Sequence, residues 1–238
     1  MMTPALPSNT KLSRGVRAHA RLQAFTLIEM LVVCVIVLTV ALVSLPGITS
    51  LSKSNSRQTA ASLTLSILDQ ARSLALSQSS AYYLVFADGN MALKNLKNVP
   101  SNSGLVEPYA YRAFAIFQES YNTLSQNYDR LQVTPWVKLP DGVAFDPDAA
   151  NVDTVFCKAS TEAFDCQLFK SPLTLPCFKF NSLGGLDEPA TSTLAQIKIF
   201  EGYVDPSGVA VITNRGKTAS EELITVSLMT GRAKRLTP

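Results

Sequence analysis

The stretch that decides the fold is Phe25-Thr-Leu-Ile-Glu-Met-Leu-Val-Val-Cys-Val-Ile-Val-Leu-Thr-Val-Ala-Leu-Val-Ser-Leu45. It is apolar almost throughout, and the chain has no other charged residue between Glu29 and Lys53. A helix of about 20 such residues, rising ~1.5 Å per residue, is long enough to cross a ~30 Å hydrocarbon layer. The stretch therefore predicts a membrane-spanning helix over residues 25–45, longer than the apolar core of about 7–15 residues in a secretory signal.

One carboxylate, Glu29, lies near the start of this apolar helix. An acid at the centre of a bilayer costs roughly 2.5–3.5 kcal/mol, so such a residue needs a wet position or a partner. One interpretation is that Glu29 stays hydrated at the cytoplasmic interface. The other is that it binds a specific cationic group, and the neighbouring residues favour this second interpretation.

The leader, residues 1–24, is basic and contains no acid. By the positive-inside rule, this end stays in the cytoplasm and the chain after Leu45 is exported. Without the leader, 17 of the 21 basic residues remain against 18 acids, a formal charge of −1, which gives no support for a globally basic nucleic-acid-binding protein. The basic residues of the leader are Lys11, Arg14, Arg17 and Arg21.

The junction Ala24-Phe-Thr-Leu-Ile-Glu-Met-Leu-Val-Val33 behind a basic leader resembles the prepilin motif of type IV pilins and type II secretion pseudopilins. The resemblance implies that a prepilin peptidase cuts between Ala24 and Phe25 and methylates the new amino terminus of Phe25. It also implies that Glu29 pairs with the terminal amine of a neighbouring subunit during assembly. The expected place of the protein is the bacterial inner membrane, with the amino terminus cytoplasmic and the carboxyl-terminal part outside, before it enters a filament.

Ala24 departs from the family pattern, which usually has glycine before the cut. A small residue is retained, so we expect cleavage, at a lower rate. The alternative is an ordinary signal anchor, or a signal peptide cut between Ala41 and Gly47, but no clear small-x-small cleavage site follows the apolar run.

The helix is expected to continue beyond the membrane segment, with a kink at Pro46-Gly47. Apolar residues then recur at spacings of three or four, which predicts an amphipathic helix ending near Ser80. Its apolar face needs a globular partner. The residues that carry this spacing are Ala60, Leu63, Ile67, Ala71 and Leu74.

Short β-branched and aromatic runs with Gly, Pro and Asx turns between them predict strands. No second helical run separates them, which favours an antiparallel sheet. The segments 95–108, 119–132 and 146–171 are expected to be insertions, with 119–132 either a loop or a short helix. The predicted strands are Ala81–Ala87, Tyr111–Gln118, Pro135–Leu139, Val143–Phe145, Pro176–Phe180, Ala195–Tyr203, Val209–Thr213 and Leu223–Leu228.

The predicted fold class is therefore α+β, a long amino-terminal helix packed on an antiparallel β-sheet head, as in the pilin fold. The expected organisation is a leader (1–24), the transmembrane half of the helix (25–45), its amphipathic half (46–80) and a β-rich head with insertions (81–238). Three segments, 68–77, 137–143 and 226–232, are similar to H-type minor pseudopilins and FimT-type minor pilins.

A classical catalytic triad is excluded for the processed chain, because the only histidine, His19, lies in the leader. We expect no enzyme and no cofactor. Asp146, Asp148 and Asp153, together with Asn151, form a weak calcium candidate, although the spacing lacks the glycine and distal glutamate of an EF-hand. An ordinary acidic turn is the favoured interpretation of these residues.

The cysteines divide between the apolar helix, which contains Cys34, and the exported part. Cys157 and Cys166 form the easiest disulfide by proximity, and closing such a loop stabilises a fold by roughly 2–3 kcal/mol. Cys177 is the third exported cysteine, and the sequence does not assign the pairing.

Arg232, Lys234 and Arg235 place three cations near the carboxyl end. FimT-type pilins that take part in DNA uptake carry a similar Gly-Arg-x-Arg element, and such cations contact phosphates in a salt-dependent way. The sequence thus favours a structural minor pilin or pseudopilin subunit, with a DNA-binding uptake pilin as the alternative. The expected partners are the prepilin peptidase, other pilin or pseudopilin subunits, the inner-membrane assembly platform and membrane lipid.

Overall fold

The computed structural model of the chain describes residues 26–91, 97, 109–124, 126–147, 160–165, 169–187, 194–205, 208–213 and 221–236, with the backbone alone for residues 41–53, 160, 161 and 194. The chain forms two compact units, with the boundary between Pro46 and Gly47.

Helix α1 runs from Leu27 to Gln78. The helix continues through Pro46, as expected for a proline that does not end it, and stops two residues before Ser80. In the first unit, the side chains of residues 26–40 are exposed on all sides of the helix. Among the described residues, none of the helices combines the length and apolar character that a membrane crossing requires.

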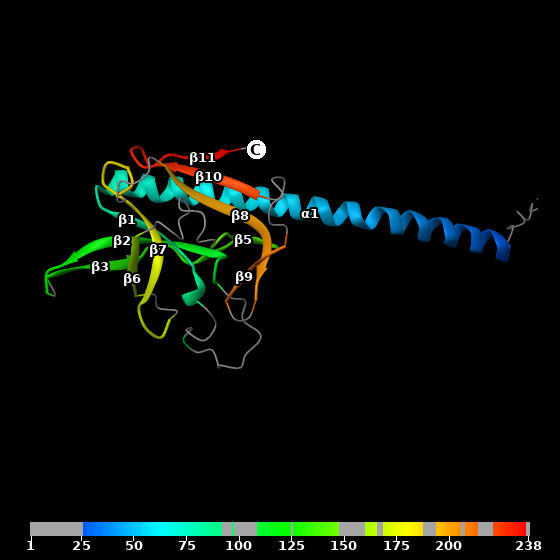
Figure 1. Ribbon diagram of the computed structural model, residues 1–238, viewed down its shortest axis with the longest axis horizontal. Helices are drawn as coiled ribbons and strands as arrows, with labels where there is room; N and C mark the ends of the chain where they lie inside the picture. The colour runs from blue at the N-terminus through cyan, green and yellow to red at the C-terminus, as the bar shows by residue number, and fades with distance from the viewer. Residues whose placement is uncertain are drawn as a thin grey trace, which may run out of the picture. The chain divides into compact units, whose positions relative to one another are not determined.

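The strands form two antiparallel sheets in the second unit (Figure 1). The first sheet has the order β3-β2-β1-β7-β6, with β4 paired to β2, and the second has the order β11-β10-β8-β5, with β9 paired to β8. This arrangement confirms the predicted antiparallel head. The elements are β1 Tyr82–Phe86, a 3-10 turn η1 Gly89–Met91, β2 Ala113–Asn122, β3 Asn127–Gln132, β4 Val137–Lys138, β5 Val143–Phe145, β6 Ser160–Phe164, β7 Leu173–Phe180, β8 Leu194–Val204, β9 Ala210–Ile212, β10 Glu221–Ser227 and β11 Ala233–Leu236.

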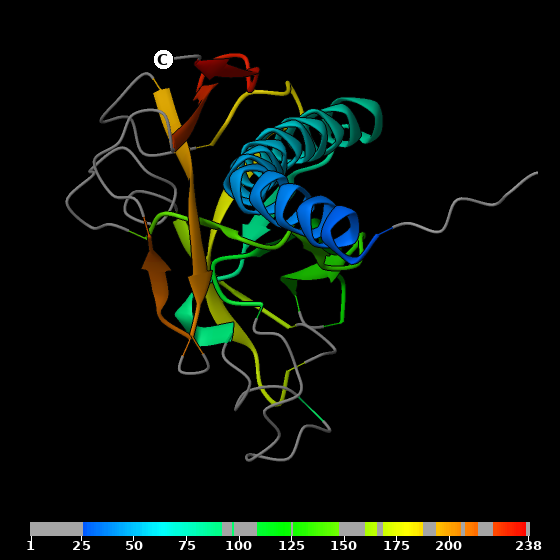
Figure 2. The same ribbon diagram turned by 90° about the vertical axis from the view of Figure 1, so that its right-hand side faces the viewer.

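The main core lies between the second part of α1 and both sheets. Three residues of the predicted apolar stripe, Ala60, Ile67 and Ala71, are buried. They belong to one core cluster with strand residues such as Phe178 and Ile199. Figure 2 shows this part of the helix, in cyan, on one side of the strands. One apolar stripe of this part of α1 is therefore buried against residues of both sheets, in agreement with the predicted α+β fold class.

A second core lies on the opposite face of the first sheet. Every residue of β1 is buried, because alternate side chains enter the two cores: Tyr82 and Leu84 enter the first, and Tyr83 and Val85 enter the second. In the second core, Tyr83 packs edge-on against Phe164, with 5.6 Å between the ring centroids. The first sheet is therefore covered on both faces, which the sequence did not lead us to expect.

The expectation for residues 119–132 was wrong. Strand β2 continues to Asn122 and strand β3 returns from Asn127 as its hairpin partner, so the segment is neither a loop nor a short helix. The sequence Asn127-Tyr-Asp-Arg-Leu-Gln132 lacks an apolar run because β3 is an edge strand with little covered surface. Strand β6, within the segment 146–171, and strand β11, at the basic carboxyl end, were missed for the same reason.

Candidate assembly, ion-pair and edge-strand sites

The first candidate site is the start of α1, where Thr26 and Glu29 cap the helix reciprocally. The Thr26 N–H and hydroxyl both donate to Glu29 Oε2, each at 2.9 Å, and the Glu29 N–H donates to Thr26 Oγ1 at 3.3 Å. This is a capping box, which satisfies backbone donors that a helix start leaves open. Glu29 Oε1 accepts no hydrogen bond from the described residues, so one oxygen of this exposed carboxylate is available to an incoming donor.

Several predicted site residues lie outside the described residues. They are the cleavage pair Ala24 and Phe25, the disulfide candidates Cys157 and Cys166, and the calcium candidates Asp148 and Asp153. Those predictions stay predictions.

Asp146, the remaining calcium candidate, is 2% exposed, and its N–H donates to Lys198 O at 3.0 Å. The parts of the chain that the structure describes contain no group of three or more potential metal ligands. Cys34 is exposed on α1, and Cys177 is buried in the second core, where it lies opposite Val85 in the β1–β7 ladder.

The basic carboxyl-terminal residues belong to β11 and the turn before it. Arg232 and Lys234 are exposed, whereas Arg235 turns towards the covered face of the sheet. Its guanidinium donates to both carboxylate oxygens of Glu222, at 2.7 and 2.8 Å, and the Glu222 side chain is 8% exposed. This bidentate pair occupies Arg235, so the three cations do not form one free phosphate-binding cluster.

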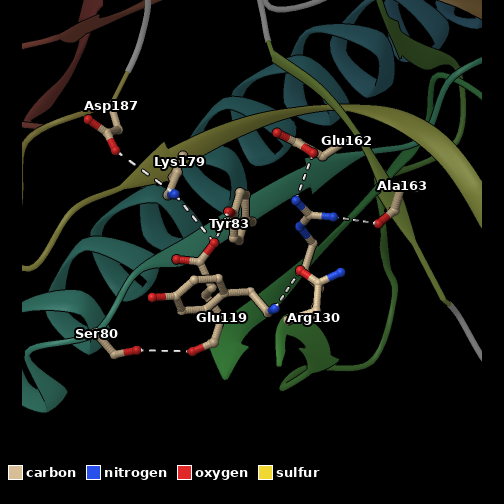
Figure 3. Close-up of polar contacts among 10 residues, drawn as sticks. Ser80, Tyr83, Glu119, Arg130, Glu162, Ala163, Lys179 and Asp187 are labelled. Carbon is tan, nitrogen blue, oxygen red and sulfur yellow. Dashed lines mark hydrogen bonds and ion pairs between the residues drawn. The ribbon is translucent and has the colours of Figure 1, made fainter. Parts of the chain in front are cut away.

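A polar cluster that the sequence did not reveal lies within the first sheet (Figure 3). The Tyr83 hydroxyl donates to Glu119 Oε1 at 2.5 Å, and Lys179 Nζ lies 3.3 Å from the same oxygen. Lys179 and Arg130 also lie over the Tyr83 ring, each 5.4 Å from its centroid. Tyr83, Glu119 and Lys179 come from β1, β2 and β7, which are distant from one another in the sequence, so no local motif signals the cluster.

The surroundings of this cluster favour the protonated forms of Tyr83 and Lys179. Burial, and next the hydrogen bond to Glu119, raise the pKa of Tyr83 above its ordinary value. Burial opposes the charged form of Lys179, but Tyr83 and Glu119 outweigh this effect and raise the Lys179 pKa. The hydrogen bonds and ion pairs of this cluster join β1, β2 and β7, and we interpret the cluster as structural.

Next to this cluster, β3 and β6 line a cleft of about 790 Å³. Arg130 on β3 reaches across to β6, where it donates to Glu162 Oε2 at 2.7 Å and to Ala163 O at 3.1 Å (Figure 3). The cleft therefore lies where the two edges of the first sheet approach each other.

No protein-family model matches the sequence, and no match was found among curated proteins. Among solved structures, the minor pseudopilin EpsH from the Type 2 Secretion System of Vibrio cholerae is similar, with 12% sequence identity and a TM-score of 0.38. The alignment covers 77% of this chain and 98% of the EpsH chain. A likeness this low does not assign the chain to a family.

Proposed function

We propose that the chain is a minor pilin or pseudopilin subunit that assembles through its amino-terminal helix into a type II secretion pseudopilus or a type IV pilus-like filament. A prepilin peptidase cuts between Ala24 and Phe25, residues 25–45 anchor the subunit in the inner membrane, and the head is exported. The proposal rests on the capping box of Thr26 and Glu29 at the start of α1. Residues in the later part of the same helix pack against the strands of an α+β head.

The geometry of Glu29 supports the pairing role. The hydrogen bonds from Thr26 go to Oε2 and hold the side chain at the helix start, while Oε1 accepts no hydrogen bond from the described residues. A methylated terminal amine of a neighbouring subunit is a cation with N–H donors, and a charge-assisted hydrogen bond to a carboxylate in apolar surroundings is strong. Such a pair also removes the cost of burying an isolated carboxylate among apolar helices.

Two substitutions separate the charge of Glu29 from its capping role. Glu29→Gln keeps the capping box, because glutamine serves at this position, but removes the charge. Thr26→Ala removes the hydroxyl from the box and keeps the charge. We expect Glu29→Gln to be processed normally and to enter filaments at least about tenfold less efficiently, as for a broken buried charge pair. Thr26→Ala should lower incorporation much less.

The measurement is the fraction of subunit recovered in sheared or cross-linked filaments, compared with the total in membranes of the native host. Equal incorporation of Glu29→Gln and the unsubstituted chain would remove the pairing role from Glu29.

Processing is tested separately by mass spectrometry of the mature amino terminus. The proposal expects a chain that begins at a methylated Phe25. A mature chain that begins after Leu45 would contradict the subunit role altogether, because the assembly helix would then be absent.

A further inference from the structure

Among the described residues, β3 has a ladder partner on one side only, β2, so its other side is an open edge with backbone groups directed away from the sheet. The Glu119 N–H donates to Ala81 O at 3.0 Å, away from β3, so Glu119 and its ladder partner Arg130 form a non-hydrogen-bonded pair. The N–H and C=O of Arg130 therefore point to the open edge, and by the two-residue repeat so do those of Tyr128 and Gln132. The Tyr128 N–H donates at 2.9 Å to the side chain of its neighbour Asn127, not to a strand.

The side chains along this edge combine the charges of Asp129 and Arg130 with large exposed apolar groups. Tyr128 and Leu131 are 57% and 56% exposed, and Tyr121, which stacks edge-on with Tyr128, is 55% exposed. Proteins generally protect open edges with charge, proline or a bulge, because an apolar edge pairs readily with another strand. Tyr128 and Leu131 therefore leave apolar groups exposed beside the cleft, among the charged residues of the edge.

The charges of the cleft indicate what binds there. Arg130 is neutralised by Glu162 across the cleft. Asp129 from β3 and Asp165 from the end of β6 also line the cleft, and both are exposed. The cleft therefore has an excess of negative charge and favours a basic occupant.

A second copy of this chain is a poor occupant. Two copies of β3 can form a symmetric antiparallel pair. If the faces of the two sheets stay aligned, even-numbered residues must then lie opposite even-numbered residues, and odd-numbered residues opposite odd-numbered ones. When it is centred on Asp129, the pair places Asp129 opposite Asp129; when it is centred on Arg130, it places Arg130 opposite Arg130. Like charges directly opposite each other destabilise a ladder, and these are the two registers that overlap most of β3.

We propose that the open edge of β3 binds an extended basic segment of another protein, added to the first sheet as a further strand. The backbone of Tyr128, Arg130 and Gln132 supplies the ladder, Tyr128 and Leu131 supply apolar contact, and Asp129 and Asp165 attract lysine or arginine side chains. This site extends the subunit role to capture of a partner, and it depends on the head alone, not on processing or on Glu29.

The test uses the full chain in detergent and a fluorescent peptide, acetyl-Val-Lys-Val-Lys-Val-Lys-Val-amide. Two control peptides accompany it, one with glutamate in place of lysine and one with N-methylated valines that cannot form a ladder. Fluorescence anisotropy measures binding, and hydrogen exchange measures protection of the amides on β3. The variant is Asp129→Asn with Asp165→Asn. The matched control, Asp69→Asn with Asp187→Asn, removes two exposed acids that do not line the cleft.

We expect the lysine peptide to bind and to slow exchange at Tyr128, Arg130 and Gln132. Affinity should fall about tenfold in the cleft variant and stay unchanged in the control variant. Failure of the lysine peptide to bind, or equal binding of the N-methylated or glutamate peptide, would overturn the proposal. A dimer of the chain through β3 that excludes the peptide would overturn the choice of occupant. These outcomes are independent of filament assembly, so they are distinguishable from failure of the proposed function.

Discussion

Tyr83 connects the second core to the polar cluster of the first sheet. Its ring is buried, and its hydroxyl donates to Glu119 at 2.5 Å. Tyr83→Phe keeps the ring packing but removes this donor, which leaves Glu119 with Lys179 as its remaining partner within the cluster. A hydrogen bond to a charged group contributes about 1.5–3 kcal/mol, so we expect the free energy of unfolding to fall by about 2 kcal/mol. Denaturant titration followed by fluorescence of Trp136, the single tryptophan, measures this change.

Tyr83 also makes the stability of the head depend on pH in the alkaline range. The folded-state pKa values of Tyr83 and Lys179 are both raised above their ordinary values. At a pH between the unfolded-state and folded-state pKa values, the native state therefore binds more protons than the unfolded state. Stability is then fully present below about pH 10 and is lost as the pH rises through the folded-state values. We expect Tyr83→Phe to flatten this loss, as measured by unfolding titrations between about pH 9 and 11. An unchanged slope would show that Tyr83 does not titrate with folding.

Among the elements, the hairpin of β10 and β11 depends on one glycine. Gly231 has φ +61°, its N–H donates to Ser227 O at 2.7 Å, and a Cβ there would overlap the carbonyl oxygen of Gly184. The left-handed backbone and the close approach both exclude a side chain. This turn places β11 so that Arg235 reaches Glu222.

The substitution Gly231→Ala should therefore cost more than backbone strain alone. Gly142→Ala is the matched control, because Gly142 also has positive φ, +82°, but a Cβ there meets nothing within 4 Å. We expect Gly142→Ala to lower the free energy of unfolding by about 1 kcal/mol. Gly231→Ala should lower it by at least about 3 kcal/mol and speed hydrogen exchange in β11. Equal effects of the two substitutions would show that the turn yields at little cost.

On the scale of the whole molecule, the sequence predicted a helix and an antiparallel β-sheet head, because both depend on local pattern. Residues 60–74 repeat with helical spacing. The capping box of Thr26 and Glu29 was not predicted, although its Thr-x-x-Glu spacing is present in the sequence. The polar cluster of Tyr83, Glu119 and Lys179 was beyond prediction, since strand register brings together residues from three strands.

The pairing of Arg235 at the basic carboxyl end was not predicted, for a related reason. Arg235 and Glu222 lie on adjacent strands, diagonally across the β10–β11 ladder, so their pairing depends on a hairpin that the sequence did not reveal. The second core was missed because its aromatic residues come from strands scattered along the chain, and alternation within β1 gives no sign that both faces are covered.

The docking of the helix on the head includes one nearly buried ion pair. Arg57 Nε on α1 lies 3.1 Å from Glu201 Oε1 on β8, and the two side chains are 11% and 10% exposed. Removing one partner of a buried ion pair is generally destabilising, whereas replacing both by apolar residues of similar volume is often neutral. The pair thus specifies where helix and sheet meet more than it stabilises their contact.

This interpretation predicts a thermodynamic cycle. Arg57→Met or Glu201→Met alone should lower the free energy of unfolding by about 3 kcal/mol, and the double substitution should return it to within about 1 kcal/mol of the original. Denaturant titration of the full chain in detergent, followed by Trp136 fluorescence, gives all four values. If the double variant is as unstable as the sum of the single variants, the pair makes no coupled contribution to helix docking.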